Sequence, residues 1–313
     1  MDSYKTSGKT GCMLCPRGCG VSRDAGVGYC GASSQVEVSH IMLHHWEEPC
    51  ISGAPDDTAH GSGAVFFTHC PLGCVYCQNK KISRRKSIGE TYSDERLAGA
   101  FLRLQSEGAY NINLVSPTQY TEQLISAVSI ARELGLTLPI VWNTGGYELP
   151  ETIRCLARTK TVDIFLTDFK YMSPELSGEL SGAPDYAEYA AQSLAEMYAS
   201  AGECIIDECG IMQSGVIVRH LILPGHRADS IAVLRRIAEI VPVDKVRLSL
   251  MAQYVPDFLP EPDAAENSDR YRSLRRRITA FEYSTVLDEA NRIGFDGFAQ
   301  DRASAKRKYT PDF

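Results

Sequence analysis

Short apolar runs alternate with longer amphipathic stretches along the chain from residue 64 onward. The runs have the length of buried strands, and the stretches between them repeat apolar residues at helical spacing. Helix-starting residues support this pattern: Ser93-Asp94-Glu95 precedes RLAGAFLRL, and Asp229-Ser230 precedes IAVLRRIAEI. A last helix is expected at about 268–293. The six predicted strands are 64–67, 112–115, 139–142, 163–167, 216–222 and 245–250.

Repeated strand–helix units predict an α/β fold with a parallel sheet and crossover helices. Six units are too few for a closed eight-stranded barrel, but they suit a partial barrel or an open doubly wound sheet. In both architectures the loops at the carboxyl ends of the strands carry the functional site.

The chain divides into three predicted parts. Residues 1–35 are rich in cysteine and glycine and too short to fold on apolar burial alone, so we expect a small metal-binding lobe. Residues 36–260 hold the strand–helix units. Residues 261–313 are expected to form a C-terminal helix and tail that pack on them.

Composition narrows the class of protein. The 313 residues are 44% hydrophobic and carry a formal net charge of -7, so no broad basic face for nucleic acid or anionic lipid is expected. The first ten residues have no apolar core of a signal peptide, and no run approaches the length of a membrane span. We therefore expect a cytoplasmic protein whose eleven cysteines are reduced. Seven of them fall in two clusters, which indicates metal ligands or redox groups, while the scattered Cys50, Cys155, Cys204 and Cys209 are expected to be ordinary residues.

Three of these cysteines lie in THCPLGCVYCQN, directly after the first predicted strand. Cys70, Cys74 and Cys77 can hold three irons of a [4Fe–4S] cluster and leave the fourth iron open for a ligand. Alternatively, one thiol is merely structural, or His69 completes a zinc site.

Four more cysteines lie in CMLCPRGCGVSRDAGVGYCGA. Cys12, Cys15, Cys19 and Cys30 supply a complete set of four thiolates, which suits either an iron–sulfur cluster or zinc. The histidines and glutamates of LHHWEEP also have metal-ligand chemistry. We expect that segment instead to pack between the N-terminal lobe and the barrel.

Charged residues interrupt two of the apolar runs. Asp168 and Lys170 share one face of the fourth strand, which indicates a polar rim of a site or a structural salt bridge. Arg219 lies in a run apolar enough to be buried on both faces, so it needs an anionic partner. His220 points to the opposite face and is expected in the core, while Gln253 follows the sixth strand at the rim.

The three-cysteine loop, with Tyr76 directly before Cys77, resembles that of the radical S-adenosylmethionine (SAM) superfamily. The segments HHWEEPCISG, GSGAVFFTHCPLGCVYCQNKKIS, NINLVSPTQY, NTGGYE, DFKYM, VRHLILPGH and LMAQYVPDF resemble proteins related to pyruvate formate-lyase activating enzyme with an added N-terminal four-cysteine cluster. This resemblance implies a partial (β/α)6 TIM-like barrel. It also implies a [4Fe–4S] cluster whose open iron binds SAM and whose electron cleaves SAM to a 5′-deoxyadenosyl radical that abstracts hydrogen.

The resemblance also implies a set of SAM contacts. Tyr76 would lie beside the adenine. Ser116 and Thr118 stand where activating enzymes have a Gly-Gly-Glu stretch that receives the SAM amino group.

Further implied contacts surround the SAM carboxylate. Asn143 and Thr144, with Asp168, resemble a turn that holds a monovalent cation there, although asparagine replaces an aspartate of the family pattern. Lys170 is placed at the same rim, and Arg219 is matched to a SAM contact.

Three functions follow as hypotheses. The first is an oxidoreductase that activates a glycyl-radical enzyme, with an electron donor such as flavodoxin or ferredoxin. The second is a radical SAM enzyme that modifies a small molecule or another protein. The third is a non-catalytic iron–sulfur protein of electron transfer.

Overall fold

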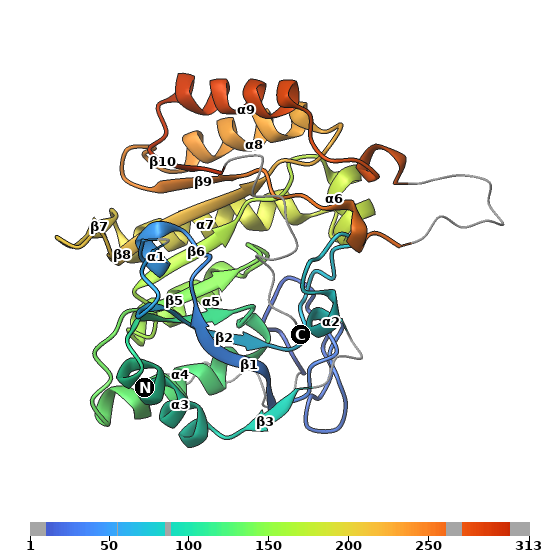
Figure 1. Cartoon of the computed structure of the whole chain (residues 1–313). Coiled ribbons are helices and arrows are strands. Elements are labelled where there is room, and N and C mark those ends of the chain that lie inside the picture. The colour runs from blue at the N-terminus through green and yellow to red at the C-terminus, as the bar shows by residue number, and fades with distance from the viewer. Residues whose placement is uncertain (1–10, 55, 85–88, 261–270, 301–313) are drawn as a thin grey trace.

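The computed structural model describes residues 11–54, 56–84, 89–260 and 271–300 (Figure 1). One sheet crosses these residues in the order β10-β9-β8-β6-β5-β4-β2-β1-β3. Its parallel strands are β2 (Gly61–Phe67), β4 (Ala109–Val115), β5 (Ile140–Thr144), β6 (Ile164–Asp168), β8 (Met212–Leu221), β9 (Arg247–Met251) and β10 (Gly297–Ala299). At one end of the sheet, β1 (Val36–His44) pairs antiparallel with β2 and with the edge strand β3 (Glu90–Tyr92). The short strand β7 (Ile205–Ile206) pairs antiparallel with β8.

The predicted α/β class with an open, mostly parallel sheet is confirmed, since β10 and β3 form two free edges. All six predicted strands are present. The sequence did not predict β1, β3, β7 and β10. These strands are short or lie outside the strand–helix repeat, so periodicity gave little signal for them.

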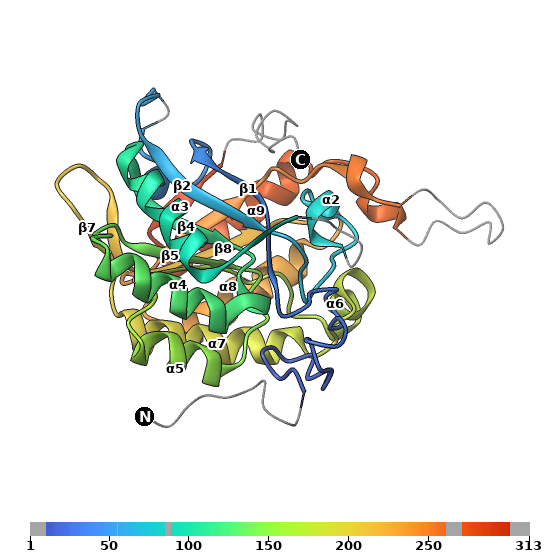
Figure 2. The ribbon, with the colours of Figure 1, turned by 90° about the horizontal axis from the view of Figure 1, so that it is seen from below.

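Helices cover the outer face of the sheet (Figures 1 and 2). Alternate residues of the central strands, such as Ile140 and Trp142 of β5, join the large core that these helices complete. The helices are α3 (Asp94–Ser106), α4 (Thr121–Glu133), α5 (Pro150–Arg158), α7 (Tyr186–Ala201), α8 (Arg227–Ile240) and α9 (Ala280–Ile293). Such one-sided cover is typical of a partial barrel, whereas a doubly wound sheet has helices on both faces.

The inner face of the sheet has a small core of its own. The short helix α1 (Pro49–Ser52) lies against it, and Ile51 packs with Val141, Ile164 and Ile217. Val141 and Ile164 lie near the amino ends of β5 and β6. The carboxyl ends are left to line a cavity.

The helix expected from about residue 268 begins later, at Ala280. Thr279 caps it by accepting a hydrogen bond from the Glu282 backbone N–H, while the Glu282 side chain accepts from the Thr279 N–H. Residues 261–270 and 301–313 of the expected C-terminal part lie outside the described residues.

Residues 11–35 form the N-terminal segment, which contains turns but no helix or strand. It packs beside α6 (Pro174–Ser181) and the loop that follows β2 (Figure 2). Leu14 is buried there, and its carbonyl accepts a hydrogen bond from Thr152 of α5.

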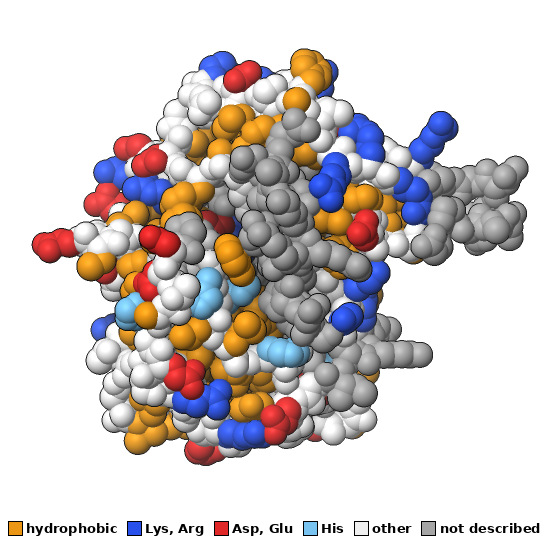
Figure 3. All heavy atoms as spheres, viewed as in Figure 1, with side chains coloured by type: hydrophobic (Ala, Val, Ile, Leu, Met, Phe, Trp, Pro, Cys, Tyr) orange, Lys and Arg blue, Asp and Glu red, His pale blue; other side chains and the backbone are white. Residues whose placement is uncertain are grey.

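Charged side chains of both signs are spread over the left and lower parts of the face shown in Figure 3. Lys and Arg gather at its right, near α2 (Lys80–Ser83) and the 3-10 helix η3 (Arg272–Leu274). No helix within the described residues is both long and apolar enough to cross a membrane.

Candidate active site

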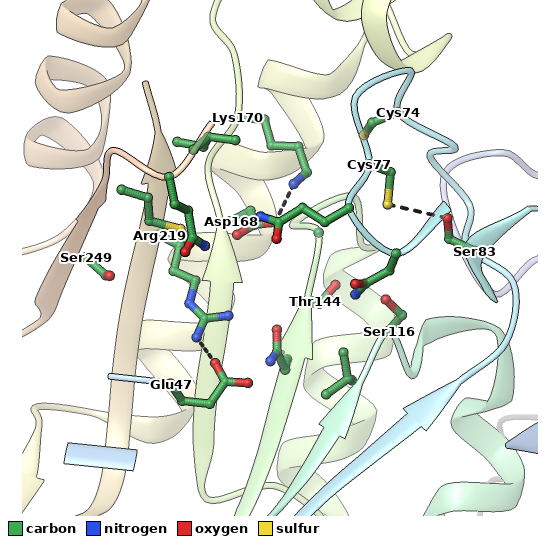
Figure 4. Close-up of a pocket in the computed structure, with 18 of the residues that line it drawn as sticks. Glu47, Cys74, Cys77, Ser83, Ser116, Thr144, Asp168, Lys170, Arg219 and Ser249 are labelled. Atoms are coloured by element: carbon green, nitrogen blue, oxygen red, sulfur yellow. Dashed lines mark hydrogen bonds and ion pairs between the residues drawn. The ribbon is translucent and has the colours of Figure 1, made fainter. Parts of the chain in front are cut away.

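A cavity of about 330 Å³ opens at the carboxyl ends of the parallel strands (Figure 4). The structure brings most of the sequence-predicted site residues to its wall, although they come from the ends of four strands and from the loop after β2. Those that line it are Cys70, Cys74, Tyr76, Cys77, Ser116, Asn143, Thr144, Asp168, Lys170 and Arg219.

The loop from Cys70 to Cys77 is defined as the three-cysteine loop. Arg84 anchors it by donating to the carbonyl oxygens of Gly73 at 2.6 Å and Cys74 at 2.9 Å. The backbone N–H of Val75 donates to Leu180 at the end of α6, at 2.9 Å. Neighbouring elements therefore fix the loop from both sides.

Two of the three sulfurs accept hydrogen bonds from hydroxyls. Ser181 donates to Cys74 Sγ at 2.9 Å, and Ser83 donates to Cys77 Sγ at 3.4 Å. Burial and the neighbouring Cys74 raise the pKa of Cys70 to about 12 and raise that of Cys77. Raised pKa values mean that these thiols resist deprotonation without a metal. A bound metal ion would overcome this, because its positive charge deprotonates the thiols that coordinate it.

These three thiols therefore fit the ligand set of a [4Fe–4S] cluster. Among the described residues, no three His, Cys, Asp or Glu side chains converge on a single-ion site. Thiolates that bind three different irons of a cubane need no such convergence. His69 faces elsewhere: its Nδ1 donates to the Arg84 carbonyl at 3.2 Å, and its Nε2 is 3.6 Å from Glu37. The zinc alternative with His69 thus has no geometric support.

Asp168 and Lys170 form an ion pair on the cavity wall. Burial alone would lower the pKa of Lys170, but Asp168 and Cys74 raise it well above its ordinary value. Lys170 therefore stays charged beside the thiols. The pair is both a salt bridge and part of the polar rim.

Arg219 reaches the cavity from β8 and is held by two carboxylates that the sequence did not predict as its partners. Its Nε donates to Glu48 Oε1 at 2.7 Å, and its Nη2 donates to Glu48 Oε2 at 2.6 Å and to Glu47. Burial would raise the pKa of Glu48, but Arg219 lowers it. Nη1 makes no hydrogen bond with a described residue, so its N–H groups are available to an anionic ligand in the cavity.

Glu47 and Glu48 belong to LHHWEEP, which lines the cavity and does not separate the N-terminal segment from the barrel. The sequence held one signal for this pairing: two adjacent glutamates, and a buried arginine elsewhere in the chain that needed acidic partners. Other cavity residues that the sequence did not predict are His44, Trp46, Ser249, Met251, Phe298 and Gln300. Gln253 lines the cavity at the end of β9 as expected.

Thr118, predicted as a SAM contact, is placed outside the cavity. It is buried in the 3-10 helix η1 (Thr118–Tyr120), and its hydroxyl donates to Glu148 Oε1 at 2.6 Å. Thr144 donates to the same oxygen at 2.6 Å. Burial raises the pKa of Glu148, the charged residue of the NTGGYE segment.

Ser116 is in the left-handed backbone region, with φ of 58°. This region favours glycine, which is the residue that the family resemblance expects at this position. The sparsely populated conformation at the cavity wall is typical of a functional site.

His220 is buried, and its Nδ1 donates to the Phe169 carbonyl at 2.7 Å. Burial lowers its pKa. The prediction of a core histidine is confirmed, but the histidine is only half satisfied, because its buried Nε2 has no hydrogen-bond partner among the described residues.

A second, much smaller cavity of about 20 Å³ lies at the N-terminal segment, and all four of its cysteines line it. A Cβ at Gly28 would lie 3.4 Å from Cys30 Sγ and 3.6 Å from Cys19 Sγ. Burial raises the pKa of Cys15 and of Cys30. Pro71 of the three-cysteine loop lines the same cavity, so the N-terminal cysteines lie beside this loop.

Comparison with known proteins defines the class of the domain that carries this cavity. Residues 64–197 match the family model of the radical SAM superfamily. The three-cysteine loop, Asp168 and Lys170 fall within the match. Over this range, which is less than half of the chain, the sequence is similar to radical SAM domains.

Two individual proteins are similar to the chain. An uncharacterized protein from Methanocaldococcus jannaschii is 26% identical over 293 residues, which cover 91% of this chain and 75% of the relative. The crystal structure of a radical SAM methyltransferase from Sphaerobacter thermophilus aligns with a TM-score of 0.49 and 17% identity. That alignment covers 77% of this chain and 65% of the methyltransferase chain, which is less than two thirds of it.

Proposed function

We propose that the protein is a radical SAM enzyme whose cluster is held by Cys70, Cys74 and Cys77. One observation carries this proposal: the three thiols line the same cavity as charged side chains from the strand ends. The three cysteines, Asp168 and Lys170 all lie within the residues that match the radical SAM family model. When bound, a [4Fe–4S] cluster supplies the electron that cleaves SAM to methionine and a 5′-deoxyadenosyl radical, which abstracts a hydrogen atom from the substrate.

The chain's own residues have charges that match the ends of SAM. The SAM methionyl group carries an ammonium and a carboxylate. Asp168 offers an anion, while Arg219 and Lys170 offer cations, and all three line the cavity. Ion pairs already hold these side chains in place, so their orientation costs little when SAM binds.

Tyr76 is proposed to contact the adenine. Its ring lines the cavity, and its hydroxyl is 2.5 Å from that of Tyr171. Tyr254 packs edge-on at 6.0 Å between ring centroids. The ring is therefore held rigidly, as a stacking surface requires. Ser116, Asn143 and Thr144 line the same cavity and are proposed as polar contacts of SAM. A cation site next to Asn143 and Asp168 stays an expectation.

Four thiols around one small cavity support a second metal centre at Cys12, Cys15, Cys19 and Cys30. By its chemistry this donor set suits an auxiliary [4Fe–4S] cluster or zinc. Among the described residues no three such side chains converge on a single ion, which favours the cluster. Its position beside Pro71 brings any such centre near the three-cysteine loop.

Activation of a glycyl-radical enzyme is the proposed reaction, and it rests on the sequence resemblance alone. A flavodoxin or ferredoxin in the same cytoplasmic compartment would supply the electron. The alternative substrates are a small molecule or another protein. A sharp increase of a glycyl-radical EPR signal on a candidate partner enzyme would select the first option.

The decisive experiment incubates the full-length, anaerobically reconstituted and reduced protein with SAM. We expect 5′-deoxyadenosine and methionine in equal amounts, quantified by liquid chromatography. Cys74→Ala should abolish both products, because the cluster loses a ligand. The matched control Cys155→Ala changes a buried cysteine of α5 outside both sets and should retain the products. Iron binding without either product would favour the electron-transfer hypothesis instead.

A further inference from the structure

Arg17 of the N-terminal segment reaches across to the three-cysteine loop and to α6. Its Nε donates to the Pro71 carbonyl at 2.8 Å, its Nη2 to the Ser181 carbonyl at 2.9 Å and its Nη1 to the Gly182 carbonyl at 2.5 Å. Ser181 ends α6 and Gly182 is its C-cap, so their carbonyls belong to the group that has no partner within a helix. A cation at this end also favours the helix dipole.

Two aromatic rings fix the guanidinium in this position. Its central carbon lies 4.2 Å from the ring centroid of Tyr29 and 5.2 Å from that of Tyr147. Tyr29 belongs to the N-terminal segment and Tyr147 to the loop after β5. The Arg17 guanidinium is therefore held by three carbonyl oxygens and two aromatic rings and does not merely project into solvent.

The residue that Arg17 holds makes a contact with a proposed cluster ligand. The Ser181 hydroxyl donates to Cys74 Sγ at 2.9 Å. The Tyr171 hydroxyl lies 2.8 Å from Ser181 Oγ, and the Tyr76 hydroxyl lies 2.5 Å from that of Tyr171. With Ser181 donating to sulfur, each tyrosine can donate to the next hydroxyl, and the buried chain ends on Cys74.

A hydrogen bond to a ligand sulfur stabilises negative charge on the cluster. Reduction adds an electron, so such a bond favours the reduced state and raises the reduction potential. We propose that Arg17 is a positioning residue that holds Ser181 against Cys74 and thereby raises the reduction potential of the cluster in the three-cysteine loop. This inference rests on the proposed function, because it needs that cluster. It makes the N-terminal segment part of the redox machinery.

The test measures the potential of the reconstituted full-length protein by an EPR-monitored redox titration. The relevant signal is the one that Cys74→Ala removes. Ser181→Ala should lower the ratio of reduced to oxidised cluster at a fixed potential by about tenfold, which corresponds to about 59 mV for one electron. Arg17→Gln should shift the ratio in the same direction, and Tyr171→Phe, which removes the donor to Ser181, should do so by a smaller factor.

Two further variants separate this role from a structural one. Arg23→Gln removes the same charge from the same segment, but Arg23 donates to the Gln119 and Ser33 carbonyls and not to Ser181. The cluster of the Arg23→Gln variant should therefore keep the wild-type reduction potential. The double variant Arg17→Gln with Ser181→Ala should shift no further than Ser181→Ala alone, because both changes remove one interaction. If Arg17→Gln does not fold, Arg17→Lys, which keeps the charge and loses the fork of donors, should give an intermediate shift.

Wild-type potentials in both Ser181→Ala and Arg17→Gln, or fully additive shifts in the double variant, would overturn the inference. A wild-type protein that binds no cluster and cleaves no SAM would overturn the proposed function as well. Cluster binding and SAM cleavage with unchanged potentials would overturn the inference alone.

Discussion

Three carboxylates and two cations share the charged wall of the cavity: Glu47, Glu48 and Asp168 face Arg219 and Lys170. This surplus of one negative charge favours a ligand that brings an ammonium or sulfonium group, as SAM does. Glu48 is the most buried of the three acids and binds Arg219 through both carboxylate oxygens. The pair orients the guanidinium as a fixed fork.

Removing Glu48 takes two of the three carboxylate hydrogen bonds from the buried Arg219 and leaves it paired with Glu47 alone. We expect Glu48→Ala to lower the free energy of unfolding by about 3 kcal/mol, measured by anaerobic urea denaturation. Glu196→Ala breaks only the exposed pair with Arg154 and should cost less than about 1 kcal/mol. Equal losses of unfolding free energy in the two variants would contradict the claim that the buried Glu48–Arg219 pair stabilises the cavity wall.

The Glu48 contribution should also depend on pH. Its pKa in the folded state lies below the ordinary value of 4.5, so the folded state favours the charged form. The stabilisation is therefore full at neutral pH and is lost as the pH falls below this value. The difference between wild type and Glu48→Ala should shrink only in that acidic range.

At the scale of elements, capping side chains set where several helices begin. Ser93 and Ser173 accept from backbone N–H groups of α3 and α6, and Thr279 does so for α9. Glu282 completes the cap of α9 and also accepts from Arg276 and from the Gly225 N–H. The start of α9 is thereby tied to the loop after β8.

Thr279→Ala should destabilise the protein by about 1 kcal/mol, because the N–H of Glu282 loses its acceptor. Thermal unfolding followed by circular dichroism measures the change. Thr285→Ala serves as control, since this half-buried threonine only donates a hydrogen bond to the Phe281 carbonyl within the helix. A cost for Thr285→Ala as large as that for Thr279→Ala would show that the cap is not the cause.

At the scale of the whole molecule, the N-terminal segment and the barrel meet beside the three-cysteine loop. The segment has no helix or strand among its described residues, so its order depends on turns, on Arg17 and Arg23, and on whatever its four cysteines bind. A metal would supply the cross-link that apolar burial does not.

Cys15→Ala should therefore remove one metal centre without disturbing the other. If both centres are [4Fe–4S], iron falls from about eight to about four atoms per chain; if the second is zinc, iron is unchanged and zinc is lost. Elemental analysis of the anaerobically purified protein measures both. Unchanged iron and unchanged zinc would refute a metal at these four cysteines.

Much of the fold was predictable because its signals are local. Apolar runs and helix-starting residues such as Ser93 depend on neighbours in the chain, and all six predicted strands are present. Strand β10 escaped prediction because its pairing partner lies far away in sequence. A Cβ at Gly297 would lie 1.9 Å from the Leu248 carbonyl of β9, a closeness that no local pattern reveals.

By itself the sequence determined the α/β class, the six central strands and the two cysteine sets, since spacing of apolar residues and thiols is written along the chain. Only the tertiary structure decided that Arg219 is paired with Glu47 and Glu48, that Thr118 faces Glu148 and not the cavity, and that Arg17 reaches Ser181. These contacts join residues from separate elements. Which residues meet depends on how the sheet curves and where its loops converge, and no single stretch of sequence encodes either.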